Sequence, residues 1–146
     1  MEDEIYLSFK VGENLAALSL KYLLKISRWT EVRKMPIPQK DLLGIIPHKG
    51  ELVPVVDLNI IWGQKSEKYK FYILLEEENH KKIAFGIEEL LELISIPAKE
   101  IKALPKKWSK YEQFIKGIYI FKEKLIFVLN ISILLKLLST TGRQNI

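Results

Sequence analysis

The residues best suited to catalysis or metal binding are few in this chain, and their spacing favours neither. The sequence contains two histidines, His48 and His80, and no cysteine. Without cysteine, disulfides, thiolate metal sites and a cysteine nucleophile are excluded. Two isolated histidines match no metal-binding spacing such as His-Glu-x-x-His. His80 follows four polar residues, so we expect it to lie exposed at a hairpin tip.

The acidic residues and glycines also lack a catalytic pattern. Of the three aspartates, Asp57 closes an apolar segment and is expected to cap the turn that follows. Asp57 and a distant glutamate could still form a carboxylate pair for acid–base work, but no spacing in the sequence supports one. The seven glycines form no dinucleotide-binding or phosphate-binding loop. We therefore predict a protein that is not an enzyme and that carries no cofactor and no metal.

The charge of the chain is basic but diffuse. Lysine and arginine total 23 against 18 acidic residues, which gives a formal net charge of +5. The lysines are spread among glutamates from Lys10 to Lys136, a pattern that mostly serves solubility. A nucleic-acid-binding small β-barrel would need a basic stripe with interleaved exposed aromatic residues. That class is retained as the alternative function.

Short apolar segments with period-two alternation predict that most of the chain is β-structure. Leu7, Phe9 and Val11 alternate with Ser8 and Lys10, so the two sets are expected on opposite faces of a strand. Further elements are expected as a strand over 25–35, a helical turn over 39–43, a strand over 90–96, and two hairpins that join 71–75 to 82–87 and 118–121 to 125–129. Pro54 interrupts the apolar segment 52–58, so its amide side should face a sheet edge or a bulge.

The C-terminal segment has the period of a helix. Four apolar residues lie at i, i+3, i+4 and i+7, and Asn130 or Ser132 is placed to cap the helix; the four are Ile131, Leu134, Leu135 and Leu138. The whole pattern predicts small barrels or a sandwich with a terminal helix. No internal repeat is evident.

The location of the protein is also predicted from the sequence. The acidic N-terminus lacks the basic and apolar regions of a signal peptide. Polar residues interrupt the apolar segment 125–138, which is too short for a membrane span. We therefore expect a soluble cytoplasmic protein without direct membrane insertion.

Residues 42–58 carry glycine, glycine, proline and aspartate at fixed offsets, as Gly44, Gly50, Pro54 and Asp57. This segment resembles the signature of CheW-like domains, in which the same residue types recur between apolar positions. The remaining elements follow in the order expected for that family over nearly the whole chain. The sequence 1–146 is therefore identified as a single CheW-like domain, with an internal boundary expected near residues 63–70.

The resemblance implies a fold and a set of partners. The fold would be two small five-stranded SH3-like barrels that share a core, with a groove between them and a C-terminal helix. The partners would be the regulatory domain of a CheA-type histidine kinase and the cytoplasmic tip of a chemoreceptor, in chemotaxis signal transduction. Such a protein is an adaptor, recruited from the cytoplasm to receptor arrays at the membrane.

The resemblance also assigns candidate binding residues. For the receptor these are Lys25, Ile26, Lys49 and Gly50. For the kinase they are Leu23, Trp29 and Val32, of which Trp29 is the best candidate for an exposed or interfacial ring. Leu23, Ile26 and Val32 have core packing as their other interpretation.

The chain departs from the family pattern at several of these positions. Lys49 replaces the signature arginine and keeps its charge, but it loses the planar group that pairs with a carboxylate through two hydrogen bonds. Lys25 replaces a frequent glutamate, which reverses the charge presented to a partner. Pro47 removes a backbone donor from the segment that carries Lys49.

Overall fold

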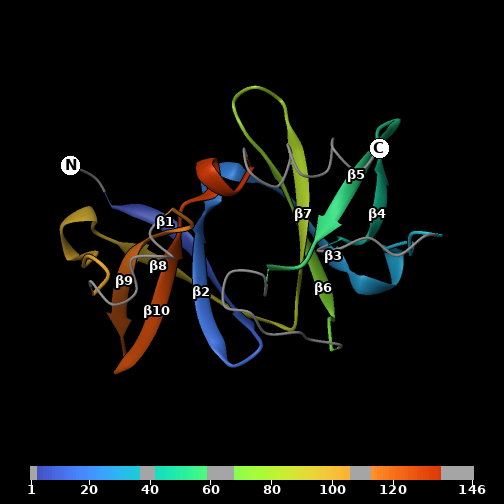
Figure 1. The fold of residues 1–146 in the computed structure, drawn as a ribbon. Coiled ribbons are helices and arrows are strands. Elements are labelled where there is room, and N and C mark those ends of the chain that lie inside the picture. Colours follow the sequence, from blue (N-terminus) through green and yellow to red (C-terminus); the bar gives the residue numbers. More distant parts are fainter. Residues whose placement is uncertain (1–2, 37–41, 59–67, 106–112, 136–146) are drawn as a thin grey trace.

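The structure is a computed structural model, and it describes residues 3–36, 42–58, 68–105 and 113–135. Within these ranges ten strands form two five-stranded sheets that lie side by side (Figure 1). One apolar face of each sheet surrounds a cluster of its own, and the other faces of the two sheets pack against each other. The predicted mainly β fold is confirmed.

The first sheet has the strand order β8-β1-β2-β10-β9 and is called the first barrel. Its strands are β1 (Glu4–Val11), β2 (Asn14–Ser19), β8 (Glu89–Ile96), β9 (Ile115–Phe121) and β10 (Lys124–Leu129). All five strands contribute to one apolar cluster inside the sheet, with Tyr6, Ala17, Ile94 and Val128 among its members. The sheet must therefore curl around this cluster.

The second sheet has the order β3-β6-β7-β5-β4 and is called the second barrel. Its strands are β3 (Leu23–Arg28), β4 (Leu42–His48), β5 (Glu51–Val56), β6 (Phe71–Glu76) and β7 (Lys82–Ile87). Its interior cluster contains Ile46, Val55, Tyr72 and Ala84.

A third apolar cluster joins the two barrels. Leu7, Phe9 and Val11 of β1 pack there with Ile73 of β6 and Phe85 of β7. Alternate residues of these strands point into their own barrel, so the central strands are buried on both faces. The predicted common face of Leu7, Phe9 and Val11 is confirmed, and the core is shared as the fold class requires.

A helix begins after Asn130 and is described over residues 131–135. The Asn130 side-chain oxygen accepts from the Ile133 amide at 3.4 Å, and its carbonyl accepts from the Leu134 amide at 3.1 Å. Of the two predicted caps, Asn130 therefore caps the helix. Leu134 and Leu135 lie fully buried in the shared core. None of the helical residues described form a segment long and apolar enough to cross a membrane.

The two barrels repeat one arrangement. In each, the strand fourth in order pairs in parallel with the third, β10 with β2 and β5 with β7. In each, one isolated bridge reaches the last strand, from Arg33 to Ile45 and from Lys102 to Ile118. Residues 44–58 align without a gap on 117–131, so Gly44 corresponds to Gly117. Five of these fifteen aligned residues are identical, and the match is too short for the sequence alone to reveal the repeat.

The repeat is also interleaved. The hairpin β1–β2 joins strands β8, β9 and β10, whereas the hairpin β6–β7 joins strands β3, β4 and β5. Each barrel thus takes strands from both sides of residues 63–70. Residues 63–67 lie outside the described ranges, and the boundary itself stays a prediction.

Two of the predicted elements are wrong. The strand expected over 25–35 begins at Leu23 and ends at Arg28, where the 3-10 turn η2 (Trp29–Glu31) follows. The helical turn expected over 39–43 is contradicted at Leu42 and Leu43, which begin β4, while 39–41 lie outside the described residues. Both hairpins and the strand that ends at Ile96 are confirmed.

Candidate functional site at the opening of the second barrel

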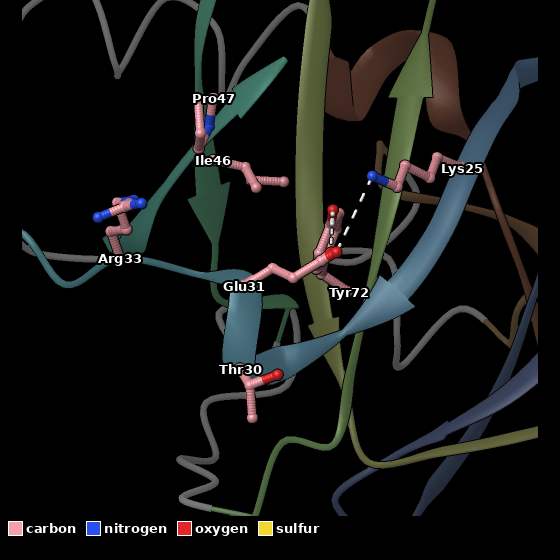
Figure 2. Close-up of a pocket in the computed structure, with 7 residues that line it drawn as sticks. All are labelled: Lys25, Thr30, Glu31, Arg33, Ile46, Pro47 and Tyr72. Carbon is pink, nitrogen blue, oxygen red and sulfur yellow. Dashed lines mark hydrogen bonds and ion pairs between the residues drawn. The ribbon is translucent and has the colours of Figure 1, made fainter.

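A pocket lies at the opening of the second barrel, between its two edge strands β3 and β4. It has a volume of about 460 Å³ and is closed on one side by η2. Figure 2 shows the lining residues, which are Lys25, Thr30, Glu31, Arg33, Ile46, Pro47 and Tyr72. Most of them are polar or charged, so this opening can recognise a partner by charge and by hydrogen bonding.

Glu31 is the centre of the polar contacts in this pocket. Ser27 Oγ lies 2.6 Å from both carboxylate oxygens, and the Tyr72 hydroxyl donates to one of them at 3.4 Å. Because η2 turns the chain back after Arg28, the Glu31 side chain lies above β3 and points into the pocket (Figure 2). Sequence reasoning missed Glu31, although the spacing of a serine and a glutamate four residues apart was a signal.

Lys25 lies on the rim of the same pocket. Its ammonium is 4.0 Å from the Glu31 carboxylate, and both side chains are more than two-fifths exposed. The reversed charge at position 25 is therefore partly balanced by a carboxylate supplied six residues later. A partner that approaches this rim therefore meets both signs of charge.

Lys49 and Gly50 form the two-residue turn between β4 and β5, and both are exposed. Their φ angles are 48° and 82°, the left-handed values that a two-residue hairpin turn requires at both positions. Pro47 belongs to β4 and lines the pocket, whereas Lys49 and Gly50 lie beyond it. Ile26 packs against the shared core. Of the four predicted receptor residues, Lys25 lines the pocket.

The predicted kinase residues are half-buried. Leu23 packs against the shared core, and Trp29 and Val32 pack against the interior of the second barrel. The Trp29 ring lies 4.9 Å from that of Tyr69, between centroids, and covers Gly86. A Cβ atom on Gly86 would lie 2.8 Å from the Trp29 ring. These residues therefore have a packing role, and their contact with a kinase stays a prediction.

The contacts of Gly44, Pro54 and Asp57 explain why the fold accommodates these residue types in the segment 42–58. A Cβ atom on Gly44 would lie 2.4 Å from the Arg33 carbonyl oxygen, so only glycine allows this bridge. Ile45 exchanges both backbone hydrogen bonds with Arg33 and faces Pro54 across the ladder. The amide side of Pro54 must then face β7, where pairing starts only at Val55. Asp57 accepts a hydrogen bond of 2.6 Å from the Tyr69 hydroxyl.

Other site classes find no support in the described part of the chain. Among residues 3–36, 42–58, 68–105 and 113–135, no three potential metal ligands gather. His80 is exposed in the β6–β7 turn, as predicted, and contacts Glu76 at 3.5 Å. Large exposed apolar residues of these ranges are aliphatic, and none is aromatic. A nucleic-acid surface needs exposed rings for stacking, so this alternative is not favoured.

Comparison with known proteins agrees with this geometry. The family model for the CheW-like domain matches residues 6–139. The chemotaxis protein CheW of Helicobacter pylori is 24% identical over 133 residues, covering 90% of this chain and 81% of that protein. The probable chemotaxis protein CheW of Rhizobium etli is 22% identical over 135 residues, covering 90% and 87%.

A solved structure has the same fold. The crystal structure of the scaffolding protein TtCheW from Thermoanaerobacter tengcongensis superposes with a TM-score of 0.74 at 22% identity. The match covers 89% of this chain and 86% of that one. The family model spans most of the sequence, and the two interleaved barrels agree with it. The chain therefore belongs to the CheW-like domain family.

Proposed function

We propose that this protein is a non-enzymatic adaptor that couples chemoreceptors to a CheA-type histidine kinase. The observation that carries the proposal is the family match over residues 6–139. A protein of this kind catalyses no reaction and holds its partners in register. Its function is then a set of coupling free energies between binding sites.

The receptor surface is proposed to run from the pocket of the second barrel to the β4–β5 turn. Lys25 and Lys49 are exposed and offer charged groups to a helical receptor tip. Gly50 allows a close approach of the backbone, since no heavy atom lies within 4 Å of a Cβ at this position. Ile26 supports Lys25 from the shared core.

The kinase surface is proposed at β3 and η2, around Leu23, Trp29 and Val32. Each of these side chains is half-buried, so part of it remains open to a partner. β3 is an edge strand of the second barrel, with one side free of strand pairing along its described length. Binding to a membrane receptor through the surface near Lys49 would bring this cytoplasmic protein to receptor arrays.

Calorimetry with two purified partners tests this proposal. We expect saturable one-to-one binding to the regulatory domain of the kinase and, separately, to the cytoplasmic hairpin of a receptor. Lys49→Glu should weaken receptor binding at least tenfold, because it places a like charge against an acidic partner surface, and it should spare kinase binding. Trp29→Ala should have the opposite pattern.

Two controls separate these effects from general damage. Lys122 has the position of Lys49 in the first barrel and nearly the same φ, 51° against 48°, so Lys122→Glu should leave receptor binding unchanged. Trp29→Phe keeps a ring against Tyr69 and should preserve the fold if Trp29→Ala does not. Absence of binding to either partner by a folded protein would refute the proposed function.

A further inference from the structure

The equivalent hairpins β4–β5 and β9–β10 differ in their ladder pairing to the neighbouring strand of their barrel. β10 pairs with β2 over three residues, beginning with Ile126 opposite Leu15. β5 pairs with β7 over two residues, and the pairing begins only at Val55 opposite Ala84. The outer half of β5, next to the Lys49–Gly50 turn, therefore lacks ladder pairing to β7.

Pro54 accounts for this difference. It occupies the position of Phe127, which pairs with Ala16 in the first barrel. Ile118 exchanges its hydrogen bonds with Lys102, just as Ile45 does with Arg33, so residues 127 and 54 both turn their amide side away from the last strand. Phe127 has an amide hydrogen to donate there, and proline has none.

An ion pair lies where this ladder pairing is missing. Lys82 Nζ is 3.0 Å from a Glu51 carboxylate oxygen and 3.2 Å from one of Glu76. Glu51 directly follows Gly50, and Lys82 lies two residues before Ala84 on β7. The Lys82 side chain is only 15% exposed, so it lies in a fixed place between the two strands. Hydrogen bonds to Glu51 and Glu76 raise the pKa of Lys82.

The first barrel has no such pair at the corresponding positions. Lys124 aligns with Glu51, and Leu15, which pairs with Ile126, corresponds to Lys82. A lysine and a leucine cannot form an ion pair. Ladder hydrogen bonds to β2 hold the β9–β10 hairpin along this stretch, whereas the ion pair of Lys82 with Glu51 holds the β4–β5 hairpin.

We propose that Lys82 is a positioning residue for the Lys49–Gly50 turn, which it fixes through Glu51. This inference rests on the proposed function, because it gives the turn its role in receptor binding. Lys82 replaces the pairing that Pro54 removes, and it keeps the turn at a constant distance from β7. Loss of the Lys82 charge leaves the fold intact and loosens the turn.

Amide hydrogen exchange of the full chain tests this inference without any partner. In Lys82→Gln, exchange at Glu51 and Val53 should rise about threefold, a change in keeping with the loss of one partly exposed ion pair. Exchange at Lys124 and Ile126 of the first barrel should stay constant. Lys81→Gln, at the neighbouring lysine, is the matched control and should change neither hairpin.

Two further variants separate positioning from general structure. Lys82→Arg keeps the charge and should restore slow exchange at Glu51. Glu51→Gln, on a side chain that is 58% exposed, should loosen the turn as Lys82→Gln does, even if the lysine variant folds poorly. Unchanged exchange in both Lys82→Gln and Glu51→Gln would overturn the inference.

Binding then tests the role of the turn. Lys82→Gln should weaken binding of the receptor hairpin about threefold and leave binding of the kinase domain unchanged. Receptor binding that stays at the wild-type level while exchange rises would overturn the positioning role. If the wild-type protein binds no receptor hairpin, the proposed function fails, and exchange alone decides whether Lys82 fixes the turn.

Discussion

The two barrels share their strand order, their bridges and their turns, yet their openings differ. Between β8 and β9 the first barrel has a pocket of about 100 Å³, where Leu91, Ile94 and Phe121 lie beside charged residues that include the ion pair of Lys122 and Glu92. The opening of the second barrel is about 460 Å³ and contains Lys25 and Glu31. Both openings thus carry charged groups, and they differ in volume and in the apolar residues beside those groups. One framework therefore accepts openings of different size and composition.

The glycines of the bridges test whether the frameworks are equivalent. A Cβ atom would lie 2.4 Å from the Arg33 carbonyl oxygen at Gly44 and 2.6 Å from the Lys102 carbonyl oxygen at Gly117. Backbone atoms cannot yield as side chains do. We expect Gly44→Ala and Gly117→Ala each to lower the free energy of unfolding by about 3 kcal/mol, measured by urea denaturation.

The comparison depends on the similarity of these two losses. A large loss for one glycine and a change below about 0.5 kcal/mol for the other would show that the bridges are not equivalent. Non-additive losses in the double variant would show that the barrels are coupled through the shared core.

A partly buried polar cluster distinguishes the first barrel and is expected to give a smaller effect on the free energy of unfolding. The Glu4 carboxylate accepts from the Tyr6 hydroxyl at 2.8 Å and from Ser19 Oγ at 3.0 Å. Burial acts to raise the pKa of Glu4, but these bonds and the charges of Lys21 and Lys116 outweigh it, and the pKa lies below its ordinary value. Burial and the bond to Glu4 raise the pKa of Tyr6.

We expect Glu4→Gln to lower the free energy of unfolding by about 1 kcal/mol at pH 7, since the carboxylate is partly exposed and screened. A depressed pKa stabilises the folded state above the unfolded value and loses its effect as the pH falls through the folded value. The difference between variant and wild type should therefore shrink below about pH 4. Thermal unfolding at pH 7 and pH 3 measures it.

Glu13→Gln is the control for this prediction, because Glu13 is exposed in the turn between β1 and β2. It should change stability by less than about 0.5 kcal/mol at either pH. A cost of Glu4→Gln that persists at pH 3 would mean that neutral hydrogen bonds, and not charge, stabilise the cluster.

The sequence predicts the hairpins well and the site poorly, for different physical reasons. The common buried face of Leu7, Phe9 and Val11 is predicted correctly, because residues on one face of a strand recur with a period of two in the sequence. β3 ends earlier than predicted because Trp29 packs on Tyr69 and Gly86, a contact between distant segments. The pocket around Glu31 is not predictable in the same way: the spacing to Ser27 is a local signal for their hydrogen bond, but Tyr72, which lies across the pocket, is 41 positions away.

The turns give the smallest predicted effect and the closest comparison of the barrels. Lys49–Gly50 and Lys122–Glu123 both have positive φ, with 82° at Gly50 and 66° at Glu123. Glycine adopts this conformation freely, whereas a glutamate there is strained. We expect Glu123→Gly to raise the free energy of unfolding by about 0.5 kcal/mol and Gly50→Ala to lower it by about 1 kcal/mol.

The essential result is that Glu123→Gly and Gly50→Ala change the free energy of unfolding in opposite directions. Both substitutions act on the same backbone conformation in equivalent turns. No heavy atom lies within 4 Å of a Cβ at Gly50, so a loss in Gly50→Ala reports backbone strain and not a clash. Urea denaturation of both variants and of the double variant measures these changes. A loss in Glu123→Gly would mean that the entropy of glycine in the unfolded chain exceeds the strain of Glu123, and that the first barrel has no need of glycine in its turn.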